Sequence, residues 1–202
     1  MGKNHRGDSL LDRAEVVWAE QRCWRICPLK LNCSPESYSL AKSVTAHLYT
    51  FGYEGLDINS FISRLQTVGV ASIVDVRELP LSRKKGFSKT ALAEYLKQAG
   101  IGYFHVPALG CPKPVRNRYR EDGDWRAYTR DFQAYLATQE ASVKQLAKFA
   151  RSSAVCLICY EADFNFCHRT YVARAAMRAG GPQVLHITAK TVLPDQPVRL
   201  VA

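Results

Sequence analysis

The sequence predicts a three-layer α/β fold, in which helices cover both faces of a mainly parallel sheet of about five strands. From about residue 47, short apolar runs alternate with stretches of helical periodicity, and this alternation is typical of βα units. The chain has 202 residues, 47% of them hydrophobic, which suffices for one well-packed core. We therefore expect one α/β domain over residues 46–190, an N-terminal extension over 1–45 and an irregular tail over 191–202.

The first half of this domain is predicted from strand runs and helix caps. Residues 47–53 and 71–77 are short runs rich in aromatic or β-branched residues and form the first two strands. A helix between them begins after Asp57, a residue type that caps helix N-termini. A second helix runs from Ser88, another capping residue, to Gly100, which suits a helix end. Each strand is thus followed by a helix, as a parallel sheet requires.

The second half continues the pattern on either side of a long basic loop. Residues 101–107 form the third strand, and 125–149 have helical periodicity with a break near Thr138. The remaining elements are a fourth strand over 154–160, a helix over 170–179 and a fifth strand over 184–188. The tail from Lys190 contains two prolines and is expected to be irregular or to extend the edge of the sheet.

Charge and cysteine content indicate the compartment and the kind of partner. The net charge is +10, and the stretch from Arg77 to Arg130 holds twelve Lys or Arg against five Asp or Glu. Basic surface attracts phosphate, so we expect a phosphate-bearing small molecule or a nucleic acid as partner. No stretch has the length of a membrane span or a signal-peptide core, and the seven cysteines are an odd number. We therefore expect a reduced, cytoplasmic protein with no membrane partner.

The extension before the domain has a different character. Residues 9–24 could form an amphipathic helix. Cys23, Cys27 and Cys33 follow with the spacing C-x3-C-x5-C, which lacks the two close ligand pairs of zinc ribbons and fingers. We interpret them as unspecific thiols.

Chemically useful side chains follow four predicted strands, at the point where each strand ends. These segments are residues 52–55, 75–77, 107–111 and 159–161. The carboxyl ends of parallel strands lie on one rim, where open α/β sheets bind their ligands, so we expect the four segments to converge there. From the first segment, Tyr53 and Glu54 are candidates for binding a substrate.

The second strand end and the loop after it suit a phosphorylated ligand. Asp75 and Arg77 are two residues apart in a strand, so they share a face. They either orient a ligand together or have an internal role, in which they pair with each other or cap a neighbouring helix. The loop candidates are Ser82, Arg83, Phe87 and Ser88. A cation beside an aromatic ring suits a phosphate and a stacked base, and a solvated loop anchored by Phe87 explains these residues equally well.

The fourth strand and the following helix carry a cluster of reactive groups. Cys159 and Glu161 end the strand, and Cys167, His168 and Arg169 open the helix. A helix N-terminus with adjacent cations stabilises a thiolate or a bound anion. Basic residues there oppose the helix dipole by about 0.3–1 kcal/mol, so a compensating anion is expected, either a ligand or an internal carboxylate.

The same cluster raises the question of a metal ion. Cys167 and His168 are adjacent and cannot easily both point at one ion, so we expect neither a metal nor another cofactor. Cys156 and Cys159 have the C-x-x-C spacing of a redox pair. Within a strand they would face opposite sides, so Cys156 is predicted to belong to the core.

In their order along the chain, these motifs resemble the family called domain of unknown function 488. The matching pieces, over residues about 47–188, are Thr50-Phe-Gly-Tyr-Glu-Gly55, Val74-Asp-Val-Arg-Glu-Leu-Pro-Leu-Ser-Arg83, Gly86-Phe-Ser-Lys89, Tyr103-Phe-His-Val-Pro-Ala-Leu-Gly110, Cys159-Tyr-Glu-Ala-Asp163 and Cys167-His-Arg169. The resemblance implies a compact α/β fold whose motifs line one pocket, and it implies no established reaction.

A weaker likeness is to the layout of rhodanese-type domains and cysteine phosphatases. Those enzymes hold a thiolate in a loop of about five residues before an arginine or a helix N-terminus. Here Cys159 precedes Arg169 by ten positions, and Asn165 stands where the arginine would be needed. The spacing therefore departs from that layout.

We expect an enzyme or ligand-binding protein that acts on a phosphate-bearing substrate, such as a nucleotide or nucleic acid. Arg77, Arg83 and Arg169 would hold the anion. The expected catalytic groups are Glu161 or Asp75 as general acid or base, His168, and Cys159 as nucleophile. The alternatives are a non-catalytic nucleic-acid-binding module and a thiol or sulfur-transfer enzyme that uses Cys159.

Overall fold

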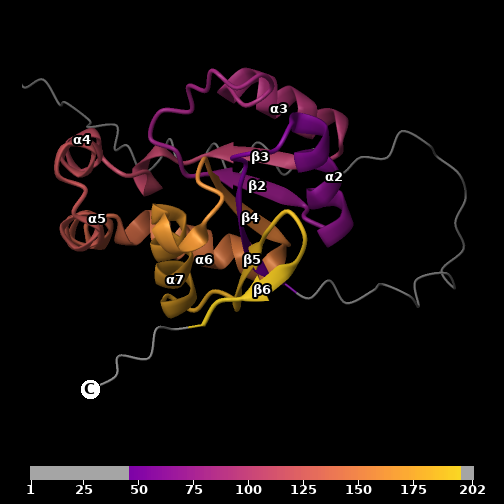
Figure 1. The fold of residues 1–202 in the computed structure, drawn as a ribbon. Helices are drawn as coiled ribbons and strands as arrows, with labels where there is room; N and C mark the ends of the chain where they lie inside the picture. The colour runs from indigo at the N-terminus through magenta and orange to yellow at the C-terminus, as the bar shows by residue number, and fades with distance from the viewer. Residues whose placement is uncertain (1–45, 197–202) are drawn as a thin grey trace, which may run out of the picture. The chain divides into compact units, whose positions relative to one another are not determined.

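A six-stranded sheet forms the centre of the domain (Figure 1). The structure is a computed structural model that describes residues 46–196, so the predicted helix and cysteines of the N-terminal extension lie outside the described residues. The strands, in chain order, are β1 (Leu48–Gly52), β2 (Ser72–Asp75), β3 (Gly102–His105), β4 (Val155–Cys159), β5 (Val184–Ile187) and β6 (Val192–Pro194). Their order in the sheet is β3-β2-β4-β1-β5-β6; the first five are parallel, and β6 runs antiparallel to β5.

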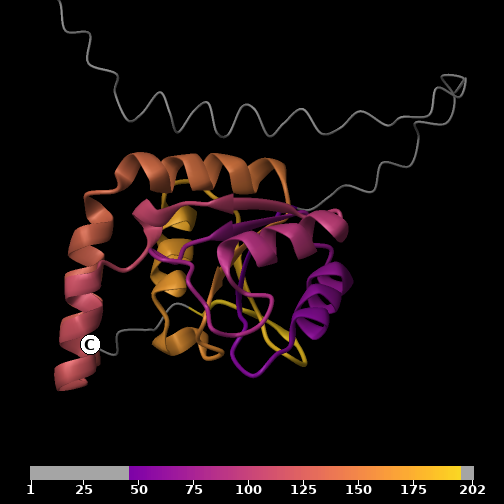
Figure 2. The same ribbon diagram turned by 90° about the horizontal axis from the view of Figure 1, so that it is seen from above.

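Helices cover both faces of this sheet, which confirms the predicted three-layer α/β fold. The helices are α2 (Ile58–Val68), α3 (Lys89–Gln98), α4 (Lys113–Asp122), α5 (Trp125–Ala137), α6 (Glu140–Ser152) and α7 (His168–Arg178), with short 3-10 helices η3 (Pro107–Leu109) and η4 (Phe164–Phe166). Figures 1 and 2 show α2 and α3 on one face and α6 on the other, with α4 and α5 beyond the end of β3. Helix α7 packs on β1, β4 and β5.

Strand alternation divides the core between the two faces. Phe51 of β1 points to the α2 face and stacks on Phe61 with ring centroids 5.0 Å apart, whereas its neighbour Thr50 points to the opposite face. Cys156 of β4 lies in the apolar cluster on the α2 face and is fully buried. It therefore belongs to the core, as the sequence predicts, and Cys159 at the end of the same strand faces the other way.

Local sequence explains where most helices begin. The carboxylate of Asp57 accepts a hydrogen bond from the backbone N–H of Ser60 at 2.9 Å and caps α2, as predicted. Ser88 occupies the N-cap of α3 without a side-chain cap bond. The helix predicted over residues 125–149 is two helices, α5 and α6, and the chain leaves α5 at Thr138.

One element differs from the prediction. Residues 113–122, expected as loop, form α4, which has no buried residue and therefore lacks the apolar periodicity that identifies helices. Of the two alternatives for the tail, residues 192–194 have the edge extension, because they form strand β6 beside β5. No helix within residues 46–196 is long and apolar enough to cross a membrane.

A buried polar network fixes β5 against the segment after β6. The imidazole of His186 lies between the hydroxyl of Thr50, 2.7 Å from Nδ1, and the carboxylate of Asp195, 3.0 Å from Nε2. Arg174 of α7 donates two hydrogen bonds to Asp195, at 2.7 and 2.9 Å. Burial opposes ionisation of Asp195, but the bonds from Arg174 and His186 outweigh it and lower the pKa of this carboxyl.

We expect Asp195→Asn to lower the free energy of unfolding by about 1–2 kcal/mol at neutral pH, because it weakens charge-assisted hydrogen bonds to two buried partners. A carboxyl group whose pKa is lowered in the folded state stabilises the protein above the unfolded-state pKa of about 3.9. This stabilisation is lost as the pH falls through the folded-state pKa. The difference between the two proteins, measured by urea unfolding, should therefore shrink below about pH 4. Glu121→Gln, at an exposed position of α4, is the matched control; an equal effect there would contradict the role of the network.

Candidate functional site

A pocket of about 760 Å³ lies at the carboxyl ends of the parallel strands. Its walls come from the loops after β1, β2 and β4, from α4, and from the starts of α5 and α7. The lining residues are Tyr53, Arg77, Glu78, Leu79, Leu81, Ser82, Arg83, Lys84, Cys111, Arg116, Tyr119, Arg120, Trp125, Tyr128, Cys159, Tyr160, Glu161, Phe166 and His168. Three of the predicted strand ends, after β1, β2 and β4, therefore contribute to one pocket. The remaining segment, residues 107–111 after β3, contributes Cys111.

Two thiols, a carboxylate and an imidazole meet at the floor of this pocket. The Sγ atoms of Cys159 and Cys167 lie 2.8 and 3.0 Å from the same oxygen, Oε2 of Glu161. The Nδ1 atom of His168 lies 3.6 Å from Sγ of Cys159 and 3.9 Å from Sγ of Cys167. Cys159, Glu161 and His168 line the pocket, and Cys167 is buried behind them. We refer to these four residues as the floor cluster.

The expectation that Cys167 and His168 point apart is wrong. Cys167 has extended backbone angles, φ −137° and ψ 137°, and forms the N-cap of α7, whereas His168 is the first helical residue. This change of backbone conformation between neighbours turns both side chains toward Glu161 and Cys159. Adjacent residues at a helix N-terminus can thus share one site.

A backbone carbonyl fixes the orientation of His168. Its Nε2 atom lies 3.0 Å from the carbonyl oxygen of Val76, just after β2. A carbonyl only accepts hydrogen bonds, so Nε2 carries the proton and, in the neutral ring, Nδ1 presents its lone pair to the two thiols. The loop after β2 therefore sets which histidine nitrogen faces the floor cluster.

Burial and close contact shift the acidity of these groups. The hydrogen bond with Cys167, together with burial, raises the pKa of Cys159 well above its ordinary value. Burial also opposes ionisation of Cys167, but the bond from Cys159 and the charge of Arg169 lower the pKa of Cys167 well below the usual range. Burial and the neighbouring Cys167 raise the pKa of Glu161. Of the two thiols, Cys167 is therefore the one that ionises more readily, with Arg169 as its cationic neighbour.

The guanidinium of Arg169 holds the segment that carries Glu161. It is fully buried, and its Nη1 and Nη2 atoms donate to the backbone carbonyls of Glu161 and Ala162 at 2.5 and 3.2 Å. On the other side of this segment, a Cβ at Gly52 would lie 1.7 Å from the carbonyl oxygen of Glu161, so this position of β1 requires glycine. Glu54 accepts from the backbone N–H of Ala162 at 3.0 Å.

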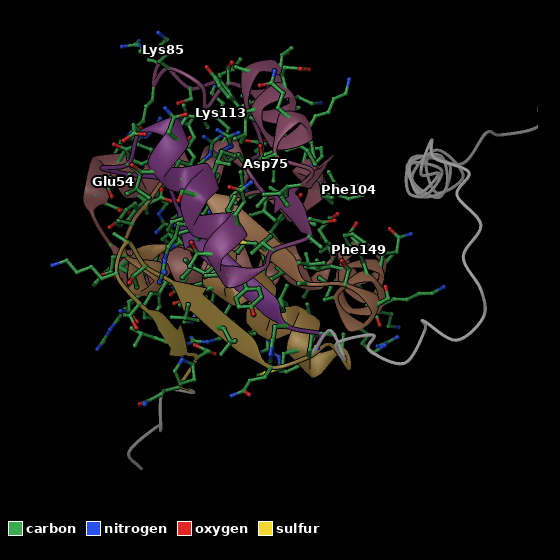
Figure 3. The ribbon with its side chains drawn as sticks, turned by 90° about the vertical axis from the view of Figure 1, so that its right-hand side faces the viewer. Glu54, Asp75, Lys85, Phe104, Lys113 and Phe149 are labelled. Atoms are coloured by element: carbon green, nitrogen blue, oxygen red, sulfur yellow. The ribbon has the colours of Figure 1, made fainter. Side chains whose placement is uncertain are left out.

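The buried ion pair between Arg77 and Asp75 supports another part of the pocket wall. Arg77 donates to both carboxylate oxygens of Asp75, at 2.8 and 2.5 Å, and also to the hydroxyl of Tyr53 and the carbonyl of Phe87. Tyr103 donates its hydroxyl to Asp75 at 2.7 Å. Figure 3 shows Asp75 inside the domain, whereas Lys85 in the loop after β2 points outward. Of the two interpretations left open for Asp75 and Arg77, the structure has the internal pair.

The structure brings seven of the predicted site residues to the pocket wall. These are Tyr53, Arg77, Ser82, Arg83, Cys159, Glu161 and His168. The other six predicted site residues do not line the pocket. These are Glu54, Asp75, Phe87, Ser88, Cys167 and Arg169. Phe87 stacks on Tyr53 with centroids 4.3 Å apart, in the apolar core. Arg169, expected to hold the ligand, binds backbone carbonyls instead.

The pocket wall built by α4 and α5 is the part that the sequence analysis missed. It consists of Arg116, Tyr119, Arg120, Trp125 and Tyr128, to which η4 adds Phe166. Tyr119, Trp125 and Tyr128 form one aromatic group, with centroids 4.8–5.5 Å apart. The helical spacing of Trp125 and Tyr128 by itself favours core packing, and both rings do pack on neighbours. The overlooked signal is the alternation of arginine and aromatic residues over 116–128.

Comparison with known proteins gives a family and no further match. A family model described as "Domain of unknown function DUF488" matches residues 57–176, which is more than half of the chain. The matched range contains the floor cluster and both α4 and α5. No curated protein and no solved structure matches the chain.

We expect Arg169→Met to lower the free energy of unfolding by about 3 kcal/mol, because it leaves two carbonyls without their charged donor. Arg178→Met changes an exposed arginine at the other end of the same helix, and we expect it to cost less than about 1 kcal/mol. Urea unfolding of both variants measures the difference. Equal effects would mean that Arg169 does not hold the loop.

Proposed function

The chain belongs to the DUF488 family, whose description states no activity, and we propose from the site itself that it is an enzyme acting on a phosphate-bearing, base-containing substrate. The substrate would be a nucleotide or part of a nucleic acid, bound in the pocket at the carboxyl end of the sheet. The observation that carries this proposal is the meeting, in one pocket, of free arginines, exposed aromatic rings and the floor cluster.

Two arginines of the pocket are available for a phosphate. Among residues 46–196, neither Arg83 nor Arg120 has an ion-pair or hydrogen-bond partner for its side chain, and both are exposed. Arg77 and Arg116, by contrast, are paired with Asp75 and Glu78. The pocket therefore combines fixed cations that shape its wall with unpaired cations that suit a charged ligand.

Exposed apolar side chains gather around the same pocket. Leu79, Leu81, Tyr160 and Phe166 are 47–84% exposed, and they account for four of the six exposed large hydrophobic side chains in residues 46–196. Phe166 lies 5.4 Å from Trp125, centroid to centroid. Apolar surface concentrated in one place marks a binding site, and aromatic faces suit a stacked base.

The floor cluster lies where chemistry on such a ligand would occur. Cys159, Glu161 and His168 face the pocket and offer a thiol, a carboxyl group and an imidazole within one small volume. These groups can serve as a nucleophile, as a general acid or base, or as ligands to a metal ion. Because Cys159 and His168 are buried whereas Arg83 and Phe166 of the same pocket are exposed, the reaction would take place away from the exposed surface.

A non-catalytic nucleic-acid-binding module is the second candidate, and the pairing of the cations of α4 weighs against it. Arg118 forms ion pairs with Asp122 and Asp131, and Arg116 pairs with Glu78. A surface that binds extended polyanions needs a row of available cations. Arg116 and Arg118 are therefore not available for such a row.

We expect nucleotides to stabilise the protein in a thermal-shift screen, by about 2.7 kcal/mol when the ligand is a hundredfold above its dissociation constant. Arg83→Ala and Arg120→Ala should each weaken nucleotide binding roughly 10–100-fold, since each removes a charge-assisted hydrogen bond. Arg126→Ala, an exposed arginine outside the pocket lining, is the matched control and should bind like the parent protein. Unchanged affinity in both pocket variants would refute the proposed phosphate site.

The contribution of the base to nucleotide binding can be measured separately from that of the phosphate. Phe166→Ala should weaken binding of nucleotides by about 1–3 kcal/mol through lost stacking, and leave the binding of inorganic phosphate and sugar phosphates unaffected.

For a short single-stranded oligonucleotide, engagement of two or three phosphates predicts a slope of log K against log salt of about −2. A much steeper slope that persists in Arg83→Ala would favour the nucleic-acid-binding module.

A further inference from the structure

We propose that the floor cluster is a binding site for a thiophilic divalent cation of the zinc class. The four atoms that would hold it are Sγ of Cys159, Sγ of Cys167, Nδ1 of His168 and a carboxylate oxygen of Glu161. Two sulfurs and an imidazole nitrogen select zinc-like ions over magnesium or calcium, which prefer oxygen ligands. This role differs from that of a nucleophile, because the thiols act as ligands.

The distances among these atoms fit a four-coordinate ion. All four lie within 4.8 Å of one another, and the measured sulfur–oxygen and sulfur–nitrogen separations run from 2.8 to 3.9 Å. Ligand atoms around tetrahedral zinc are about 3.3–3.8 Å apart, given bonds of about 2.0–2.3 Å. Small side-chain movements therefore suffice to enclose an ion, and the backbone positions are already in place.

The surroundings orient the ligands as metal sites require. The proton of His168 is directed to the carbonyl of Val76 at 3.0 Å, which leaves Nδ1 as the coordinating nitrogen. Arg169 fixes the carbonyl of Glu161, so the carboxylate remains beside both sulfurs. When the ion binds, each thiol bonds to it through sulfur and releases its proton to solvent.

The site is reachable from one side. Three of the four ligands line the pocket, and Glu161 is the half-buried one, so it is the ligand that can yield its place to water or to a substrate oxygen. For the phosphate-bearing substrate proposed above, on which this last step rests, the ion would supply a Lewis acid at the pocket floor. Binding of the ion itself does not depend on that substrate.

Titration of the reduced, full-length protein with Co²⁺ tests the site without any organic ligand. Cys23, Cys27 and Cys33 are first replaced by serine in the full chain, so that thiols outside the described residues do not contribute. We expect a single Co²⁺ per chain, with the visible absorption of a tetrahedral ion and a thiolate-to-cobalt charge-transfer band, and displacement by Zn²⁺. Failure to bind Co²⁺, or binding without the charge-transfer band, would overturn the proposal.

Variants assign the signal to the floor cluster. Cys167→Ser and His168→Asn should each weaken Co²⁺ binding at least about tenfold, whereas Cys111→Ala, a buried thiol of the same pocket, should bind like the parent. Glu161→Gln, at the most exposed ligand, keeps the test valid if a cysteine variant does not fold. Unchanged cobalt spectra in Glu161→Gln and in the folded ligand variants would place the ion elsewhere and contradict the assignment.

Discussion

The buried guanidinium of Arg169 is the constraint on which the site depends. It lies in the first turn of α7, yet its hydrogen bonds go to the segment after β4, so helix and strand end are fixed relative to each other. Gly52 allows that segment to lie directly against β1. Glu161 and Cys167 are brought together because the side chain of Arg169 joins the two ends of the nine-residue stretch from Glu161 to Arg169. A charge buried among carbonyls is costly unless its donors are used, which makes the arrangement specific.

The arginines at the carboxyl end of the sheet fall into two groups, buried and exposed. Arg77 and Arg169, the most buried cations, serve the protein itself, one through Asp75 and the other through backbone carbonyls. The exposed Arg83 and Arg120 remain available. Burial thus separates cations that build the pocket from cations that can meet a ligand. Arg77 and Arg169 donate to acceptors within the protein, although the buried Nε atom of Arg169 has no hydrogen-bond partner among the described residues.

Local patterns in the sequence were enough for the βα order, the Asp57 cap and the floor residues Cys159, Glu161 and His168. Each depends on periodicity or on a strand end, which neighbouring residues determine. Helix α4 was not predictable in this way, since it buries no side chain and two of its arginines, Arg116 and Arg118, pair with carboxylates outside the helix. The role of Arg169 and the convergence of Cys167 with His168 depend on tertiary contacts and backbone angles that a sequence pattern does not contain.

The absence of buried residues in α4 has a consequence for how the family can diversify. This helix forms a wall of the pocket while contributing nothing to the apolar core, and it is attached by ion pairs and ring contacts. Substitutions on it can therefore alter which molecules fit without lowering the stability of the sheet. The floor, fixed by Gly52 and Arg169, has no such freedom. One side of the cavity can therefore change by substitution while the floor cluster keeps its geometry.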